Sequence, residues 1–176
     1  MTAPEGVRRV ETSGGLVVVL ETARDGDGEE LFGLFAGIVA RGEGFPQAPP
    51  LSQSAFDAAW GSGVTAVAIA RLGPPAPSAG LVGAYSLKPN FPGRAGHIAN
   101  AGYMVDVPWR GRGAGRALVE DSRVEARRLG FDAMQFNLVF ESNPARRLYE
   151  ELGFVVTGRV PDALEGEDAL VYWREL

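Results

Sequence analysis

Residues 108–118 read Pro-Trp-Arg-Gly-Arg-Gly-Ala-Gly-Arg-Ala-Leu and stand between an apolar stretch and an amphipathic one. Glycines let a backbone approach a phosphate closely, and the free N–H groups of a starting helix point at such an anion. The helix dipole adds about half a positive charge at that end. Arg110 and Arg112 flank the turn with forked donors that suit phosphate oxygens. The stretch therefore predicts a pyrophosphate site at a strand–turn–helix junction.

Two other phosphate-binding loops do not fit this stretch. Walker A requires a lysine after its last glycine, and the only lysine of the chain is Lys88. The dinucleotide fingerprint requires a third glycine, where this sequence has Arg116 or Leu118. The remaining form is Arg-x-x-Gly-x-Gly over 110–115. A glycine-rich helix start with solvated arginines is the simpler interpretation. However, three glycines in five residues lower the stability of the helix, which favours a functional reason for their presence.

The composition limits the class of protein. The chain has 176 residues, 45% of them hydrophobic and 22% charged, with a net charge of −5, and it suits one globular domain. This charge argues against a broad nucleic-acid surface. The absence of cysteine and the single histidine, His97, exclude a thiol nucleophile and argue against a metal site. Without a leader or a long apolar run, we expect a cytoplasmic protein with no membrane contact.

The periodicity of apolar residues predicts an α/β fold with one domain over 16–176, after a flexible segment at 1–15. Strands are expected at 16–20, 64–72, 81–88, 97–107, 133–140, 154–160 and 168–174. Helices are expected at 27–41, 52–60, 113–129 and between Asn143 and Gly153. In the last helix Asn143 is the expected N-cap and Pro144 the first helical residue.

A second segment, Asn143-Pro-Ala-Arg-Arg-Leu-Tyr149-Glu-Glu-Leu-Gly153-Phe154, follows the glycine turn. Together the two segments resemble the GCN5-related N-acetyltransferase (GNAT) superfamily. The resemblance implies a mixed, splayed central sheet of six or seven strands with helices on both faces. It also implies acetyl-CoA as cosubstrate, and a homodimer, since dimers are common in the superfamily.

A narrower resemblance follows from His97-Ile-Ala-Asn100, Gln135-Phe-Asn137 and Lys88-Pro-Asn-Phe-Pro-Gly-Arg94. These stretches are similar to fungal acetyltransferases that act on azetidine-2-carboxylate and related amino acids. In that branch, asparagines matching Asn100, Asn137 and Asn143 are implicated in substrate handling, oxyanion stabilisation and CoA contact.

The resemblance implies a set of cofactor-binding residues. A splayed strand would leave N–H groups free near its end, for pantetheine and the thioester oxygen, and the glycine turn would hold the pyrophosphate. The set comprises Met104, Val105, Arg110, Gly111, Arg112, Gly113, Ala114, Gly115, Asn143 and Tyr149.

Tyr149 and Asn100 are the candidate catalytic residues. Tyr149 is the implied acid for the CoA thiolate, although its helix face also suits core packing. Asn100 is a polar residue on an otherwise apolar strand face, so it either donates to the oxyanion or substrate or bonds a neighbouring backbone. Asn137, Phe45 and Arg94 are candidate acceptor-binding residues. No general base is evident from the sequence.

The expected reaction is transfer of the acetyl group of acetyl-CoA to the amine of a small amino-acid-like acceptor. Direct attack is favoured because no cysteine can carry the acetyl group. Two alternatives remain open: an acetyltransferase for a protein N-terminus, polyamine or antibiotic, and a non-catalytic acyl-CoA-binding module.

Overall fold

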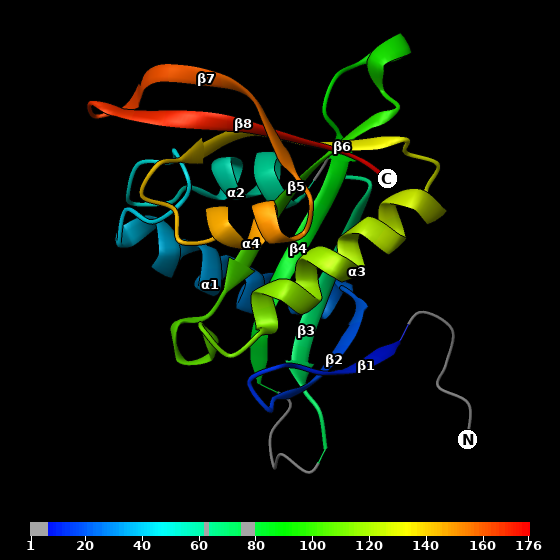
Figure 1. The fold of residues 1–176 in the computed structure, drawn as a ribbon. Coiled ribbons are helices and arrows are strands. Elements are labelled where there is room, and N and C mark those ends of the chain that lie inside the picture. Colours follow the sequence, from blue (N-terminus) through cyan, green and yellow to red (C-terminus); the bar gives the residue numbers. More distant parts are fainter. Residues whose placement is uncertain (1–6, 62–63, 75–79) are drawn as a thin grey trace.

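A computed structural model describes residues 7–61, 64–74 and 80–176 of the chain. Its strands form one sheet in the order β1-β2-β3-β4-β5-β6-β8-β7 (Figure 1). The strands are β1 Arg8–Glu11, β2 Val17–Thr22, β3 Ala66–Leu72, β4 Leu81–Pro89, β5 Ile98–Val105, β6 Ala133–Phe140, β7 Val155–Leu164 and β8 Glu167–Glu175. The α-helices are α1 Gly28–Ala40, α2 Gln53–Trp60, α3 Ala114–Arg128 and α4 Arg146–Glu151.

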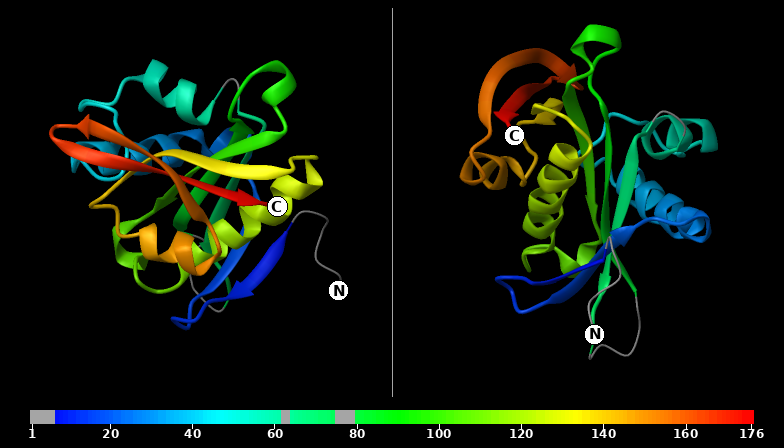
Figure 2. Two further views of the ribbon diagram at one scale, coloured as in Figure 1. Left: turned by 45° about the horizontal axis from the view of Figure 1, so that its top comes forward. Right: turned by 90° about the vertical axis from the view of Figure 1, so that its right-hand side faces the viewer.

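The helices cover the sheet on both faces, as Figure 2 shows, and this confirms the expected α/β architecture. Helices α1 and α2 pack on one face around Phe35, Trp60 and Met104. Helices α3 and α4 pack on the other face around Leu118 and Tyr149. Strands β3, β4 and β5 therefore contribute side chains to both cores, because successive side chains of a strand point to opposite faces.

The sheet has eight strands, one more than the seven strand ranges expected from the sequence, and the additional strand lies near the N-terminus. Of the segment 1–15, expected to be flexible, residues 1–6 lie outside the described part. Arg8–Glu11 form strand β1, paired antiparallel with β2. The sequence Arg-Arg-Val-Glu has little apolar content, so its pairing depends on neighbours that only the folded chain supplies.

Local signals set most helix boundaries. Ser52 caps α2, its hydroxyl accepting from the Ala55 N–H at 3.1 Å, as expected. Gly130 and Gly153 follow α3 and α4 with φ of 88° and 80°, a backbone conformation that favours glycine. Helix α4 is shorter than expected, because it begins at Arg146 rather than at Pro144.

Within the described residues, no helix is both long enough and apolar enough to span a membrane. The same residues contain no group of three or more histidine or acidic side chains placed to hold a metal ion.

Candidate active site

The glycine turn joins β5 to α3 as the sequence predicts. Gly111 and Gly113 have φ of 69° and 85°, in the left-handed region. Gly113 immediately precedes α3, and its carbonyl accepts from the Ala117 N–H at 3.1 Å. We call residues 110–115 the glycine loop. Its amides stand at the N-terminus of a 15-residue helix, where backbone N–H groups and the helix dipole favour an anion.

The two arginines of the glycine loop have different surroundings. Arg110 bonds Glu43 at 2.8 Å and donates through Nε to the Val105 carbonyl at 3.0 Å. Its hydrogen bond to Glu43 holds the pKa of that carboxyl below its usual range. Arg112 instead stacks on the Trp109 ring at 5.4 Å and is exposed, and the described residues give it no carboxylate partner. Both arginines are exposed, but Arg110 ties the glycine loop to the loop 41–52, whereas Arg112 leaves its guanidinium available to an anion.

Strands β5 and β6 diverge. They pair in parallel only at Ile98 with Ala133 and Ala99 with Met134. On its other edge, β5 stays paired with β4 as far as Val105. A gap therefore opens between β5 and β6 after Ala99, which is the splay that the resemblance implies.

The hydrogen bonds of β5 show which backbone groups face this gap. The Asp106 N–H donates to the Val82 carbonyl at 2.9 Å, and the Asn90 N–H donates to the Ile98 carbonyl at 2.8 Å. In an antiparallel pair, hydrogen-bonded positions alternate along the strand. Both bonds show that the even-numbered residues of β5 direct their backbone N–H and C=O groups at β4. The odd-numbered residues therefore direct their N–H and C=O groups toward the gap.

Val105, rather than Met104, offers its N–H to the gap. The Val105 carbonyl accepts from Arg110 on the same side, which agrees with the alternation. The expectation for Met104 is wrong, because its amide faces β4 in this register. The Met104 side chain is buried on the face of the sheet that α1 and α2 cover, whereas that of Val105 lies on the face that α3 and α4 cover.

Asn100 spans the point where the two strands separate. Its Nδ2 donates to the Gln135 carbonyl on β6 at 3.1 Å and to Asn90 Oδ1 at 3.2 Å. Both hydrogens of the amide are used, so Asn100 bonds its surroundings and does not aim a free donor at an oxyanion. This is the second of the two roles that the sequence left open.

Three further amide side chains lie beside Asn100, and we call Asn90, Asn100, Gln135 and Asn137 the amide cluster. Asn137 donates to Asn90 Oδ1 at 2.6 Å, while its own Oδ1 accepts from Asn90 at 3.1 Å and from Gln135 at 2.9 Å. Sequence reasoning missed Asn90. Its signal was the hairpin register, because pairing of Lys88 with Asn100 brings Asn90 to the start of β5.

Phe45 lies beside the same face of β5. Its ring packs edge-on against Phe35, with 4.9 Å between centroids. A Cβ added at Gly102 would lie 3.7 Å from the Phe45 ring and 3.9 Å from the Trp60 ring. Gly102 and Asn100 share a strand face, so the aromatic pair and the amide cluster border one region.

Arg94 is not part of that group. It lies exposed on the 3-10 turn Gly93–Ala95, and the hydrogen bonds of the amide cluster do not include it. Its carbonyl lies 3.2 Å from Nδ1 of His97. Within the described residues, no aspartate, glutamate or histidine bonds the amide cluster, so the geometry identifies no general base there.

Asn143 has a different local role from the one expected. Its Oδ1 accepts from the Ala145 N–H at 2.9 Å, a turn that precedes α4 rather than an N-cap of the helix. A Cβ added at Gly44 would lie 3.7 Å from Asn143 Nδ2. Asn143 therefore stands beside the loop 41–52, next to the residues that Arg110 holds.

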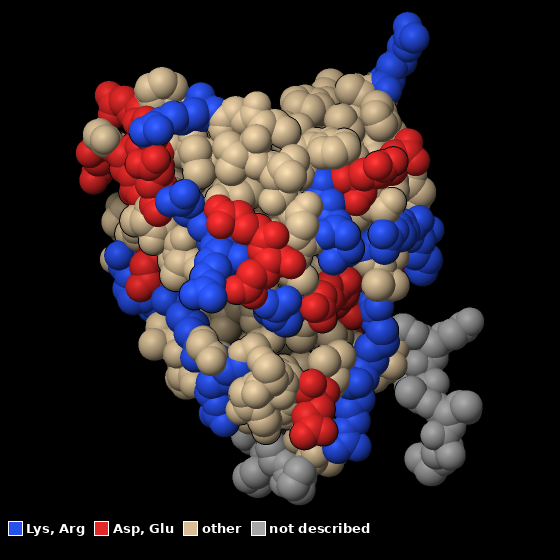
Figure 3. Space-filling model, viewed as in Figure 1, with Lys and Arg blue, Asp and Glu red and all other residues tan. Residues whose placement is uncertain are grey.

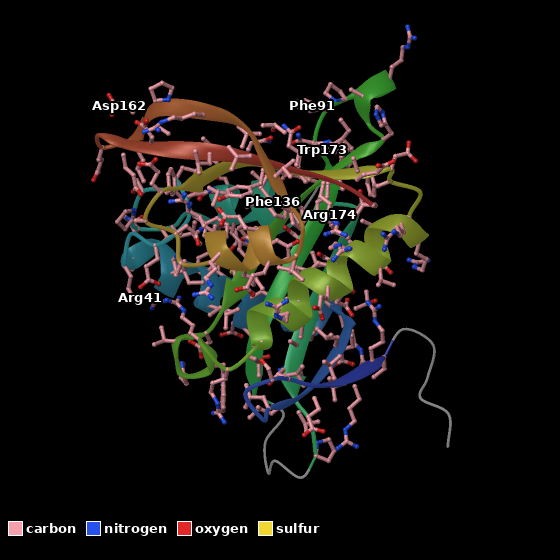
Figure 4. All side chains as sticks on the ribbon, viewed as in Figure 1. Arg41, Phe91, Phe136, Asp162, Trp173 and Arg174 are labelled. Atoms are coloured by element: carbon pink, nitrogen blue, oxygen red, sulfur yellow. The ribbon has the colours of Figure 1, made fainter. Side chains whose placement is uncertain are left out.

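Tyr149 is buried where α4 meets the sheet. Its ring lies 4.7 Å from that of Phe136, which Figure 4 shows beside α4, and 6.3 Å from that of Tyr103 on β5. Burial raises the pKa of Tyr149 above its ordinary value, so the phenol keeps its proton at neutral pH. These contacts place the Tyr149 ring in the core, as its helix face suggests. Its role as the acid for the CoA thiolate stays a prediction.

The glycine loop, the end of β5 and α4 meet at one place. A Cβ added at Gly115 would lie 3.8 Å from Val105 and 3.8 Å from Leu148, the neighbour of Tyr149. Ala114 is buried beside Gly115. The start of α3, the end of β5 and helix α4 therefore adjoin.

Comparisons with known proteins agree with this geometry. The model of the Acetyltransferase (GNAT) family matches residues 47–154. The chain is 43% identical over 94 residues to N-acetyltransferase aca1 of Schizosaccharomyces pombe, a match that covers 52% of this chain and 45% of that relative. The aligned stretch is thus less than half of that relative.

Solved structures share the fold over nearly the whole chain. A GCN5-related N-acetyltransferase from Kribbella flavida has a TM-score of 0.80 and 33% identity, covering 90% of this chain and 98% of that one. A GNAT superfamily phosphinothricin acetyltransferase from Sinorhizobium meliloti, solved in complex with AcCoA, has a TM-score of 0.76, 20% identity and coverage of 90% and 88%. Family model, fold and sequence likeness agree, and the chain belongs to the acetyltransferase (GNAT) family.

Proposed function

We propose that the protein transfers the acetyl group of acetyl-CoA to the amine of a small amino-acid-like acceptor. The observation that carries the proposal is the gap between β5 and β6, which has the Val105 N–H on its edge and the N-terminus of α3 at its end. An extended thioester chain can lie along a free strand edge as a further strand would.

The cosubstrate would bind through three parts of this site. Backbone N–H groups of Gly111–Gly115 and the solvent-facing Arg112 hold the pyrophosphate. The free edge of β5 holds the pantetheine amides. The Val105 N–H donates to the thioester oxygen and stabilises the negative charge that develops there during attack.

Transfer of the acetyl group then occurs by direct attack. A neutral amine attacks the thioester carbon, a C–N bond forms, and the C–S bond breaks. The amine loses one proton to solvent, and the departing sulfur receives one. Tyr149, protonated at neutral pH, donates to that sulfur as its charge develops and is then reprotonated from solvent.

The acceptor side favours a small polar molecule with both a carboxylate and an amine. The amide cluster offers donors and acceptors without net charge, and Asn137 is exposed. Phe45 and Trp60 supply an apolar wall next to it. This combination supports acceptors such as proline and its analogues, in line with the resemblance to the azetidine-2-carboxylate branch.

A screen of acceptors tests the proposal. Thiol release from acetyl-CoA is followed over amino acids, proline analogues, polyamines, aminoglycosides and peptides with a free N-terminus. Turnover on imino acids and small amino acids is expected. Turnover on peptides or polyamines alone would overturn the acceptor assignment, and failure to bind CoA would overturn the function itself.

A second candidate, a non-catalytic acyl-CoA-binding module, is favoured by one observation. Within the described residues, the amide cluster has no carboxylate or imidazole bonded to it that could take the amine proton. This candidate expects CoA binding in calorimetry and no thiol release with any amine in the screen.

The charged surface does not favour a polyanionic partner. Basic and acidic side chains are interspersed over the face shown in Figure 3, and acidic groups lie beside the basic ones. A small acceptor is consistent with this distribution.

A further inference from the structure

The turn between β1 and β2 contacts the glycine loop at Arg112 and Gly113. Thr12, which is 8% exposed, donates through Oγ1 to the Arg112 carbonyl at 2.6 Å. The same oxygen accepts from the Leu16 N–H at 3.1 Å, and the Thr12 N–H donates to the Leu16 carbonyl at 2.8 Å. The hydroxyl therefore has a fixed orientation, with its proton directed at the glycine loop.

The backbones of the β1–β2 turn and the glycine loop lie in close contact. A Cβ added at Gly14 would lie 2.6 Å from both Cα and O of Arg112. A Cβ added at Gly113 would lie 2.8 Å from Cβ of Thr12. Larger residues cannot be accommodated on either side unless the backbone moves, so glycine permits the contact in each segment.

A second contact anchors the same hairpin to α3. Arg8 of β1 forms an ion pair with the buried Asp121 of α3, which also accepts from the Tyr85 hydroxyl at 2.7 Å. Figure 1 shows the dark-blue hairpin running beneath α3 near its first turn. The hairpin is thus held to α3 independently of the Thr12 contact. The position of Thr12 is therefore set by the hairpin and does not depend on the glycine loop.

The Thr12 hydrogen bond orients one peptide group of the loop. In a trans peptide the C=O and N–H point in opposite directions. Because the Arg112 carbonyl points at Thr12, the Gly113 N–H points away from the hairpin. Gly111 and Gly113, both with positive φ, would otherwise leave this peptide free to turn over.

We propose that Thr12 is a positioning residue for the cosubstrate: its hydroxyl fixes the Arg112–Gly113 peptide so that the Gly113 N–H faces the pyrophosphate. This inference rests on the proposed function. It gives the N-terminal hairpin a role in cosubstrate affinity that acts through the backbone of the glycine loop.

Calorimetric titration with CoA tests the inference on the full chain. Thr12→Val keeps the shape of the side chain and removes the donor, and we expect the Kd for CoA to rise by about 3- to 10-fold, the effect of one hydrogen bond. Thr12→Ser restores the donor and is expected to return the Kd to within about twofold of the unsubstituted protein. In the transfer reaction, the KM for acetyl-CoA rises in Thr12→Val while kcat is maintained.

Thr22→Val is the matched control, because Thr22 is exposed on β2 of the same hairpin and is expected to leave the Kd unchanged. Thermal melting of each variant shows that it is folded at the titration temperature. An unchanged Kd in Thr12→Val would overturn the inference, as would a Thr12→Ser variant as weak as Thr12→Val, or a loss in kcat with KM unchanged. If the unsubstituted protein itself gives no heat with CoA, the proposed function has failed instead.

Discussion

The side chain of Tyr149 has a ring packed among other aromatic rings and a hydroxyl that stays protonated at neutral pH. Its ring contacts Phe136, Tyr103 and Tyr172, so the position of the hydroxyl is set by the core rather than by a flexible side chain. Replacing a tyrosine with phenylalanine keeps this packing and removes only the donor.

We therefore predict that Tyr149→Phe lowers kcat by about 100-fold or more, the usual contribution of a positioned proton donor. The Kd for CoA is expected to stay within about twofold, because the pyrophosphate contacts are intact. Steady-state rates and calorimetry measure the two quantities on one preparation. A variant with unchanged kcat would remove Tyr149 from the mechanism.

Tyr85→Phe serves as the control for that experiment. Tyr85 is also buried, but its hydroxyl donates to Asp121 on α3, away from the gap. Stability is expected to fall by about 1–3 kcal/mol, because Asp121 loses a buried partner. The rate of the folded protein should not change.

We expect Asn137 to contribute to acceptor binding and Asn100 to contribute to the stability of the fold. We predict that Asn137→Ala raises the KM for the acceptor by about 3- to 10-fold, the effect of one hydrogen bond, without changing the Kd for CoA. Asn100→Ala should instead lower the free energy of unfolding by about 1–3 kcal/mol, because the Gln135 carbonyl loses its partner. Acceptor kinetics and urea unfolding separate the two. Equal effects of both variants on acceptor KM alone would contradict the distinction.

At the scale of elements, one ion pair joins the loop 41–52 to the glycine loop. Arg110 bonds Glu43 and lowers the pKa of its carboxyl. A lowered folded-state pKa stabilises the protein above the unfolded value, and this stabilisation is lost as the pH falls through the folded value. The pair is partly exposed, so its contribution is small.

We predict that Glu43→Gln lowers the free energy of unfolding at pH 7 by about 0.2–1 kcal/mol. The difference between the two proteins should begin to shrink near pH 4.5, the usual value for this carboxyl, and vanish at lower pH. Urea unfolding at several pH values measures it. A difference that stays constant as the pH falls below 4.5 would contradict the assignment.

Elements with strong local signals could be predicted from the sequence. Helix α3 has its glycines before and after it, and β6 has an apolar face of alternating residues. The start of α4 was misplaced because Asn143 fits both an N-cap and a preceding turn, and only the fold decides between them. Strand β1 was missed because its stability comes from β2 and from Asp121, far along the chain.

At the scale of the whole molecule, the proposed function depends on the gap between β5 and β6, and this gap has no local sequence signal. The position of the divergence depends on register with strands on both sides. The same register decides that Val105 rather than Met104 presents its amide. Asn100 was predicted to need a partner, but identifying Gln135 required the neighbouring strand.

Because CoA would bridge the glycine loop, β5 and α4, its binding should stabilise the whole domain. We predict that CoA at about 100 times its Kd raises Tm by about 5–11 °C, since such binding adds about 2.7 kcal/mol and each kcal/mol moves Tm by about 2–4 °C at this size. Differential scanning fluorimetry against CoA concentration measures the shift. Adenosine alone, which lacks the pyrophosphate, is the control and should give a much smaller shift.

The most direct measurement is a crystal structure of the protein with acetyl-CoA. We expect the pyrophosphate on the amides of the glycine loop, the pantetheine along the free edge of β5, and the thioester oxygen within hydrogen-bond distance of the Val105 N–H. A ligand bound elsewhere, or a β5–β6 gap closed by strand pairing with the ligand outside it, would overturn the proposed cosubstrate site.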